Sequence, residues 1–431
     1  MSFKKGTVSE EFENAIKIGR PPNIVQLFPN SMALIVSGKV IDRAMIKKGK
    51  AMTIAANGRN HFIIRGALRA AQRANAAIIL EIAKSEGGGN AYCPVNYWNI
   101  ARQADAVMNE LGITVPVAIH ADHYGIKSEK DVEAAKVEIP TMFEAGITSI
   151  AIDASHMPDA DNLSANLALH SYLPEWAGYE TEIGEIKGKL GLSTADEALF
   201  LIQGLNANNA FPDWIALNNG TTHGIEQSDE GIQVPLTAQI HEVLAKYNIS
   251  GAQHGTSGNS SDRLRDIVQK TNTTKANVAT ALQMISWGVK VNDFGNAILD
   301  ENGEFLKMPS AGMTDDMWHE MVRYANERDI KGGNYKKLNL PFENKLLSLP
   351  RDIRERMAQG VEDFVYNLLT QVFNAQDTAP LALEAILEAG SHDLGPKSAR
   401  IEDPTKWTED DIQKRASALD PDKGPAGDFD D

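Results

Sequence analysis

Short apolar runs alternate along the chain with longer segments whose apolar residues recur every three or four positions. The first pattern predicts buried β-strands and the second predicts amphipathic helices. Helical periodicity occurs, among other places, over 60–75, 131–145, 194–205 and 237–247. The predicted strands are 51–55, 77–82, 115–119, 148–153, 179–183, 213–217, 250–253 and 288–292.

This alternation predicts an α/β protein, because a helix after each strand returns the chain for a parallel strand. Eight such pairs indicate a closed (β/α)8 TIM barrel. Reactive groups in such barrels lie on the loops at the C-terminal ends of the strands. The polar residues that follow each predicted strand are therefore candidates for a site.

The pattern changes near residue 309, where helical periodicity takes over, for example in 315–327 and 351–376. The end of the chain is rich in Pro, Gly and Asp, a composition that favours disorder. We therefore predict a barrel over 1–308, a helical C-terminal region over 309–420 and a disordered tail over 421–431. The helical region could serve as a lid, as an oligomer contact or as both.

The charge balance excludes two classes of partner. The 431 residues carry 42 Lys and Arg against 58 Asp and Glu, a formal net charge of −16. Such a field repels phosphate backbones and anionic lipid, so we expect no nucleic-acid or membrane partner.

The chain contains one cysteine, Cys93, which rules out an intramolecular disulfide and a cysteine-based metal cluster. The first twenty positions are polar, and no run of eighteen apolar residues occurs. We expect a cytoplasmic protein, in which a metal would need His and carboxylate ligands.

Histidines follow three of the predicted strands. His123, His223 and His254 lie far apart in the sequence but would face one another across a barrel mouth. Three neutral imidazoles with an open fourth position are a ligand set of catalytic zinc. The alternative is that they are isolated hydrogen-bonded or surface histidines, which is the commoner situation.

Carboxylates follow the same strands. Asp153 and Glu182 could hold a second ion or an alternative position of the first. Alternatively, they are loop charges that pair with lysines such as Lys187. Asp122 directly precedes His123, so strict alternation would keep the two from being buried on one strand face. A carboxylate at that mouth can act as a general acid and base, or can orient a histidine ligand.

Two glycine-containing loops are candidates for phosphate binding. Residues 254–258 precede a predicted helix, which places the amides and side chains of Gly255, Thr256 and Ser257 at a helix N-terminus. Gly295, in the loop expected after the eighth strand, would permit close approach of a ligand. A tight turn is the alternative for both loops. Glu86 begins a glycine run that indicates a flexible loop.

Six motifs occur in order between residues 120 and 292, within a region of similarity that spans roughly residues 51–296. With them the chain resembles the class II, metal-dependent fructose-bisphosphate aldolases and their ketose-phosphate aldolase relatives. The motifs are H-x-D-H at 120–123, S-x-x-x-D-x-S at 149–155, E-x-E-[LI]-G at 180–184, H-G at 223–224, H-G-x-S-G at 254–258 and K-x-N at 290–292.

The resemblance implies a zinc-dependent lyase that cleaves a ketose phosphate reversibly. Its most probable substrate by analogy is fructose 1,6-bisphosphate, which yields dihydroxyacetone phosphate and glyceraldehyde 3-phosphate without a lysine Schiff base. Asp122 would shuttle the hydroxyl proton. The resemblance also favours a homodimer or a higher homo-oligomer. The implied zinc ligands are His123, His223 and His254, with Asp153 and Glu182 at a second or alternative cation position, divalent or monovalent.

The resemblance assigns the dihydroxyacetone phosphate half to Gly224, Gly255, Ser257 and Asn292. Three departures keep other functions open. The family's acidic G-G-x-E-D loop is replaced by 185–191, which leaves Glu185 as a candidate proton donor. The N-x-D-T/S-D motif is absent from 292–296, and Gln-x-Ser is replaced by 81–83. The alternatives are an aldolase for tagatose bisphosphate or a sulfosugar phosphate, and a catalytically silent sugar-phosphate-binding relative.

Overall fold

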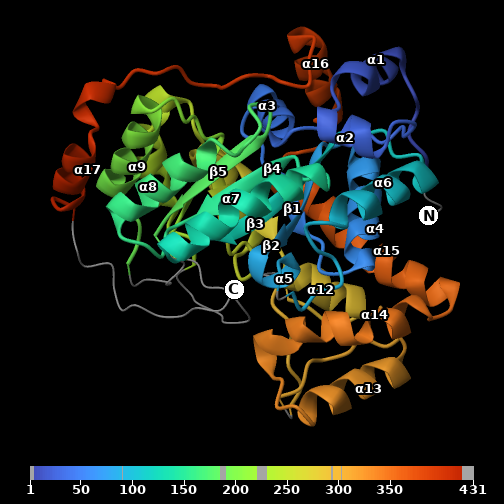
Figure 1. Cartoon of the computed structure of the whole chain (residues 1–431). Coiled ribbons are helices and arrows are strands. Elements are labelled where there is room, and N and C mark those ends of the chain that lie inside the picture. Colours follow the sequence, from blue (N-terminus) through green and yellow to red (C-terminus); the bar gives the residue numbers. More distant parts are fainter. Residues whose placement is uncertain are drawn as a thin grey trace.

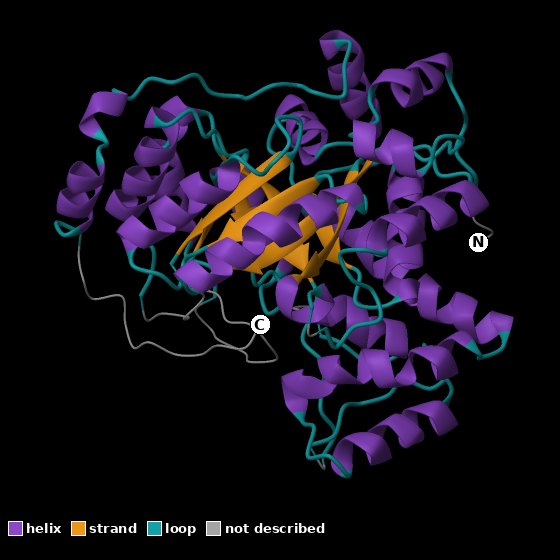
Figure 2. Cartoon of the chain, in the orientation of Figure 1, coloured by secondary structure: helices purple, strands orange, loops and turns teal. Residues whose placement is uncertain are grey.

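The computed structural model describes residues 4–89, 91–184, 191–220, 231–292, 295–301 and 303–419. Eight parallel strands close into a barrel in sequence order, which confirms the predicted fold class, and Figure 2 shows them at the centre of the molecule, enclosed by helices. The strands are β1 (Thr53–Asn57), β2 (Ile78–Ala83), β3 (Val117–Gly125), β4 (Ser149–Asp153), β5 (Gly178–Ile183), β6 (Trp214–Leu217), β7 (Ser250–Gln253) and β8 (Thr273–Val278).

Helices surround this barrel because each strand is followed by an amphipathic segment with a defined start. Asn60, for example, caps the first outer helix by accepting hydrogen bonds from the amides of Phe62 and Ile63. The helices between β1 and residue 288 are α4 (His61–Ala74), α5 (Lys84–Gly87), α6 (Ile100–Leu111), α7 (Glu129–Glu144), α8 (Asp159–His170), α9 (Ala195–Ala207), α10 (Val234–Val243), η1 (Ala245–Tyr247), α11 (Ser261–Lys270) and α12 (Thr280–Trp287).

The eighth strand was predicted at the wrong place. β8 pairs with both β1 and β7, whereas residues 288–292 form only isolated bridges at Val289 and Val291. β8 has the sequence Thr-Thr-Lys-Ala-Asn-Val, which lacks the apolar run that a buried parallel strand usually shows. Its Lys275 is fully buried inside the barrel, so a charged interior side chain concealed the strand.

The N-terminal end of the barrel is closed by α3 (Gly38–Lys48), which contacts β2, β3, β5 and β8. Two further helices precede it, α1 (Glu10–Ile18) and α2 (Pro22–Leu27). A C-terminal segment crosses the same end on its way from α16 (Ala379–Ala389) through η4 (Pro404–Lys406) to α17 (Glu409–Ala416), as Figure 1 shows. Lys397 of this segment pairs with the buried Asp42 of α3 at 2.6 Å.

An excursion over residues 288–350 follows α12 and forms a separate cluster of helices beside the strands' C-terminal ends (Figure 1). It contains α13 (Asp315–Asn326), η2 (Gly332–Leu338) and α14 (Asn339–Leu347). Trp318 and Phe342 pack in a hydrophobic cluster that also contains Trp287 of α12 and Phe62 of α4. The excursion is therefore anchored to the barrel through both α12 and α4.

The chain then returns to the barrel. α15 (Arg351–Asn367) packs along α4, and η3 (Leu368–Val372) contacts α11, so this segment occupies the position of an eighth outer helix. A Cβ atom on Gly66 of α4 would lie 2.5 Å from the carbonyl oxygen of Ala358, so only glycine allows this close approach.

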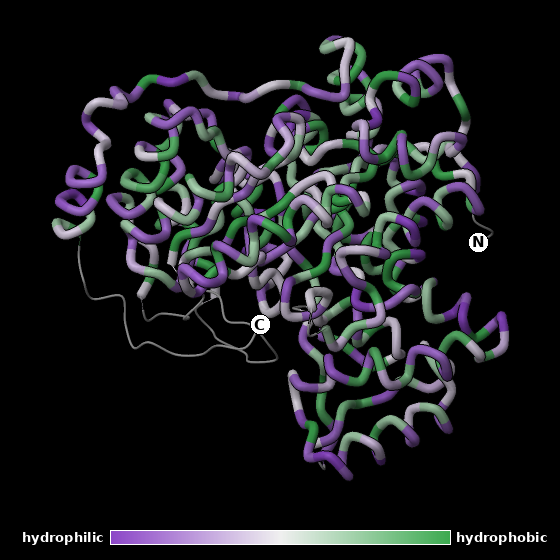
Figure 3. The backbone as a smooth tube through the Cα atoms, viewed as in Figure 1, coloured by the Kyte–Doolittle hydropathy of each residue, from purple (hydrophilic) through white to green (hydrophobic). Residues whose placement is uncertain are grey.

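The division into 1–308 and 309–420 stays a prediction about folding units. Packing nevertheless places Val361, Val365 and Ile386 in the same core as Ile54 of β1. The predicted tail over 421–431 lies outside the described residues. Figure 3 shows α17 as mostly hydrophilic. In the described part of the chain, no helix is both long and apolar enough to span a membrane.

Candidate active site

Two adjoining cavities lie where the strands end. The smaller, of about 70 Å³, is bounded by β1, β2, β3 and the loops after β7 and β8. The larger, of about 320 Å³, shares Thr256 and Ser257 with it and is also lined by Asn292 and Gly295. The smaller cavity is lined by Asn57, Arg59, Glu81, Ala83, Glu86, Asp122, His123, Gly255, Thr256, Ser257, Asn277, Ala279 and Thr280.

A bulge in β3 brings two consecutive residues into this mouth. The pairing of β3 with β4 shifts register between Ala121 and Tyr124, and His123 has a positive φ of 41°. A bulge breaks the alternation of side chains, and this conformation is uncommon for a residue other than glycine. Asp122 and His123 therefore both line the smaller cavity and both are buried, contrary to the expectation from strict alternation.

His123 and His254 meet at the mouth, with their ring centroids 4.2 Å apart. Nδ1 of His123 lies 3.6 Å from Oδ2 of Asp153 and 3.4 Å from Oε1 of Glu182. Nδ1 of His254 lies 3.5 Å from Oε2 of Glu182. Four sets of side chains in the described residues lie close enough to share an ion, and two of them contain His123: Asp122 with His123 and His254, and His123 with Asp153 and Glu182.

The two acidic residues of this cluster differ in their electrostatics. Burial opposes ionisation of Asp153, but His123, with smaller effects of His156 and Ser155, outweighs burial and lowers the pKa of Asp153. Burial and the neighbouring Asp153 raise the pKa of Glu182 well above its usual value. Oε1 of Glu182 is buried and accepts no hydrogen bond from any described residue. A cation would remove the cost of burying this carboxylate, so the donor set fits a metal.

Asp122 is held as an anion beside this cluster. Nδ2 of Asn277 donates a hydrogen bond to Oδ1 of Asp122 at 2.8 Å, and Nζ of Lys275 lies 3.5 Å from the same oxygen. Burial would raise the pKa of Asp122, but His123 and Lys275 more than offset this effect and lower the pKa. A carboxylate with this environment can accept a proton from a group bound in the cavity.

A family model described as fructose-bisphosphate aldolase class-II matches residues 39–328, which is more than half of the chain. The chain belongs to this family. Of its motif residues, Asp122 and His123 from 120–123 and Gly255, Thr256 and Ser257 from 254–258 line the smaller cavity at the C-terminal ends of the strands.

Sequence relatives agree with this membership. A fructose-bisphosphate aldolase of Staphylococcus aureus (strain Mu50) is 34% identical over 134 residues, which is 31% of this chain and 42% of the relative. One from Staphylococcus epidermidis (strain RP62A) is 28% identical over 224 residues, covering 51% of this chain and 72% of the relative. The chain therefore matches less than half the length of the S. aureus protein.

A solved structure shares the fold. The fructose-bisphosphate aldolase of Campylobacter jejuni superposes with a TM-score of 0.54 at 17% identity and covers 80% of this chain and 97% of its own. At this identity, the likeness supports the barrel architecture alone.

The position of β8 corrects one aldolase motif. The K-x-N pattern was assigned to 290–292, but the strand itself carries Lys275-Ala276-Asn277, followed by Ala279 and Thr280. The family's N-x-D-T/S-D pattern therefore keeps its hydroxyl, as Thr280, and has Ala279 and Ala281 in place of its two carboxylates. Asn292 and Gly295 are not in the loop directly after β8, and their contact with substrate stays a prediction.

Lys275 is a functional candidate that sequence reasoning missed. Its Nζ donates to Oε2 of Glu180 at 2.7 Å and lies 2.9 Å from Nε2 of His120. Burial alone would lower the pKa of Lys275, but Glu180, Asp122 and Glu81 outweigh it and raise the pKa. Residues 275–277 also match K-x-N, but this match identifies Lys275 only if the eighth strand is placed there.

We expect Lys275→Met to lower the free energy of unfolding by about 3–5 kcal/mol, because removing one partner leaves buried carboxylates uncompensated. Thermal unfolding followed by circular dichroism measures this change. Lys270→Met is the matched control, since its pair with Asp266 is exposed and such pairs contribute about 0–1 kcal/mol. Equal midpoints for the two variants would contradict a stabilising role for Lys275.

Several predicted site residues lie outside the described residues. They are His223, Gly224, Glu185 and Lys187. Of the three predicted histidine ligands, the structure therefore describes only His123 and His254. The role of His223 stays a prediction.

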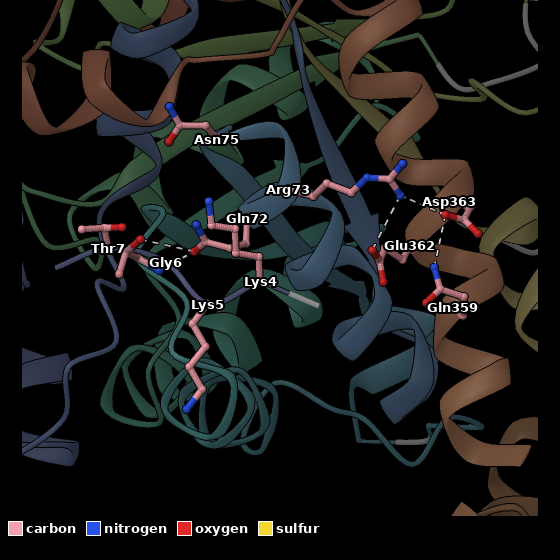
Figure 4. A pocket seen from close by; sticks show the side chains of 11 residues that line it. Lys4, Lys5, Gly6, Thr7, Gln72, Arg73, Asn75, Gln359, Glu362 and Asp363 are labelled. Carbon is pink, nitrogen blue, oxygen red and sulfur yellow. Dashed lines mark hydrogen bonds and ion pairs between the residues drawn. The ribbon is translucent and has the colours of Figure 1, made fainter. Parts of the chain in front are cut away.

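A further cavity, of about 810 Å³, lies away from this mouth, between the N-terminal segment, α4 and α15. Figure 4 shows Arg73 on one side, directed at Glu362 and Asp363, and Lys4 and Lys5 on the other. None of the clusters of potential metal ligands found in the described residues lies here. Those clusters lie among the strand-end residues instead.

Proposed function

We propose that the protein is a metal-dependent lyase that catalyses reversible aldol cleavage of a ketose phosphate, with fructose 1,6-bisphosphate as its substrate. The observation that supports this proposal most strongly is the convergence of His123 and His254 with Asp122 at the barrel mouth. Membership of the class II aldolase family supplies the reaction class.

We infer that zinc binds His123, His254 and His223, the ligand set of a catalytic zinc site. Asp153 and Glu182 would hold the alternative position, or a second divalent or monovalent cation. Bound there, the metal would supply electrophilic polarisation of the substrate's ketone and adjacent hydroxyl. His123 is kept in place by the β3 bulge, and His254 by a contact of 2.9 Å between its Nε2 and Oε1 of Glu180.

Asp122 would take the proton of the substrate hydroxyl as the carbon–carbon bond breaks. Its lowered pKa keeps it ionised and ready to accept that proton. The amide of Asn277 fixes the carboxylate, and its other neighbour, Lys275, supplies positive charge. Acid–base catalysis by one positioned group contributes about 10²–10⁴-fold to a rate.

The substrate's phosphate half would bind the loop after β7. Gly255, Thr256 and Ser257 line the smaller cavity, and the last two are shared with the larger cavity that Asn292 and Gly295 line. Gly224 would complete this set. We also propose that the protein is cytoplasmic and works as a homodimer or higher homo-oligomer.

A panel of phosphorylated ketoses tests the proposed reaction directly. We expect purified protein to hold about one tightly bound divalent metal per chain, to release a triose phosphate from fructose 1,6-bisphosphate, and to lose this activity with a chelator. Restoration by added zinc is the control for the chelator. Metal-independent turnover that borohydride traps as a covalent adduct would reject the proposal.

Another ketose phosphate is the second candidate, and two positions favour it. Glu81 replaces the family's glutamine at the smaller cavity, and Ala279 replaces one of its carboxylates. Such changes at a site that hydrogen-bonds hydroxyl groups alter which sugar fits. Faster cleavage of tagatose bisphosphate or of a sulfosugar phosphate in the same panel would decide for this candidate.

A further inference from the structure

Arg59 is the one arginine or lysine among the residues described as lining the smaller cavity. It follows the end of β1 by two positions, and only 6% of its surface is exposed. Burying a guanidinium is costly unless its charge is matched. Its place at the mouth therefore calls for an explanation beyond general surface charge.

Glu86 fixes this guanidinium. Oε1 of Glu86 accepts a hydrogen bond from Nε of Arg59 at 2.5 Å. Its Oε2 accepts from Nδ2 of Asn57 at 2.5 Å and from the amide of Ala83 at 3.1 Å. Glu86 belongs to α5 and is itself buried, so the flexible loop expected at this residue is wrong.

Gln283 of α12 supports the same arginine, and Asn339 of the excursion in turn contacts Gln283. Nη1 of Arg59 donates to Oε1 of Gln283 at 3.2 Å, and this oxygen also accepts from Nδ2 of Asn339 at 2.8 Å. Gln283 lies on α12 and Asn339 begins α14. The orientation of Arg59 is thus set by two independent parts of the fold.

Arg59 lines the smaller cavity, and its Nη2 donates no hydrogen bond to any described residue. Ser257 and Thr280 line the same cavity. Thr280 starts α12, and the N-cap residue of this helix, Ala279, makes no side-chain cap. Uncapped amides at a helix N-terminus favour an anion.

A change in the motif after β8 also favours an anion in this cavity. At the position where the class II pattern has a carboxylate after β8, this chain has Ala279, which removes a negative charge from the cavity. Glu81 and Asp122 remain there and would repel an anion. A fixed guanidinium is the group that best offsets such repulsion, since it offers parallel donors to phosphate oxygens.

We propose that Arg59, positioned by Glu86, binds the phosphate group of the dihydroxyacetone phosphate half of the substrate and determines the preference for a phosphorylated donor. The inference rests on the proposed aldolase function. Arg59 contacts the phosphate, and Glu86 acts through Arg59 as a positioning residue.

Binding of inorganic phosphate to the metal-loaded protein tests Arg59 without any need for turnover. By calorimetry, Arg59→Ala should weaken this binding about 10- to 100-fold, the value of a hydrogen bond to a charged group. The phosphate affinity of Arg59→Lys should lie between those of the wild type and Arg59→Ala, because an ammonium group keeps the positive charge but lacks the paired donors of the guanidinium. The matched control is Arg328→Ala, an exposed arginine on the excursion, which should bind as the wild type does.

The condensation reaction separates a phosphate contact from a structural role. Arg59→Ala should lower kcat/KM for dihydroxyacetone phosphate but leave that for dihydroxyacetone nearly unchanged. Glu86→Gln should raise the KM for the phosphorylated donor more than it changes kcat. Parallel losses for both donors, or unchanged phosphate affinity in Arg59→Ala, would overturn the inference. Phosphate binding that depends on Arg59 in a protein inactive on every ketose phosphate would reject the proposed function instead.

Discussion

Asp122→Asn should reduce turnover of the ketose phosphate by about 10²–10⁴-fold and leave substrate affinity nearly intact. The substitution keeps the shape of the side chain and retains an oxygen that can accept the hydrogen bond from Asn277. It removes the negative charge that His123 and Lys275 stabilise. The proton of the substrate hydroxyl then has no acceptor at this position.

Steady-state kinetics and calorimetric binding of the substrate, measured on the same preparation, check this expectation. Asp316→Asn is a matched control, since Asp316 is an exposed residue in the first turn of α13, and it should not change either quantity. A loss of binding equal to the loss of turnover would show that Asp122 holds the site together and does not move the proton. A wild type that binds the sugar phosphate without turning it over would favour the silent binding relative.

The barrel could be predicted from the sequence because most of its strands are apolar runs that end in polar clusters. β2, for example, is Ile-Ile-Leu-Glu-Ile-Ala, a pattern expected for a strand buried on both faces. β8 could not be predicted in this way, because Lys275 and Asn277 point into a polar network that exists only once eight strands have closed around it. Its apolar content is too low for any local rule.

The site was predicted in part for a similar reason. The identities of His123 and His254 follow from motifs, but the entry of both Asp122 and His123 into one cavity depends on a bulge that pairing with β4 creates. The role of Glu86 depends on Asn57 and Arg59, which belong to a different strand end. Tertiary contacts of this kind leave no periodic signal in the sequence.

His254→Ala should abolish metal binding in the working range and, with it, cleavage of the ketose phosphate. His254 is 1% exposed and lies between His123 and Glu182, so its removal leaves a buried gap in the ligand set. Changing a residue that merely supports a ligand weakens metal binding about 10- to 100-fold, so loss of a ligand should cost at least as much. Metal content after desalting, measured by plasma mass spectrometry, reports the effect, with the exposed His319→Ala as control.

His120 provides the sharper comparison, because Glu81, His120 and Asp122 also lie close enough to share an ion. Both of its ring nitrogens are engaged, Nδ1 with Oγ of Ser149 at 2.8 Å and Nε2 with Nζ of Lys275 at 2.9 Å. We therefore expect His120→Ala to retain metal while it lowers thermal stability, whereas His254→Ala loses metal. Loss of metal in His120→Ala together with retention of metal in His254→Ala would place the ion deeper in the barrel and would show that the proposed ligand set is wrong.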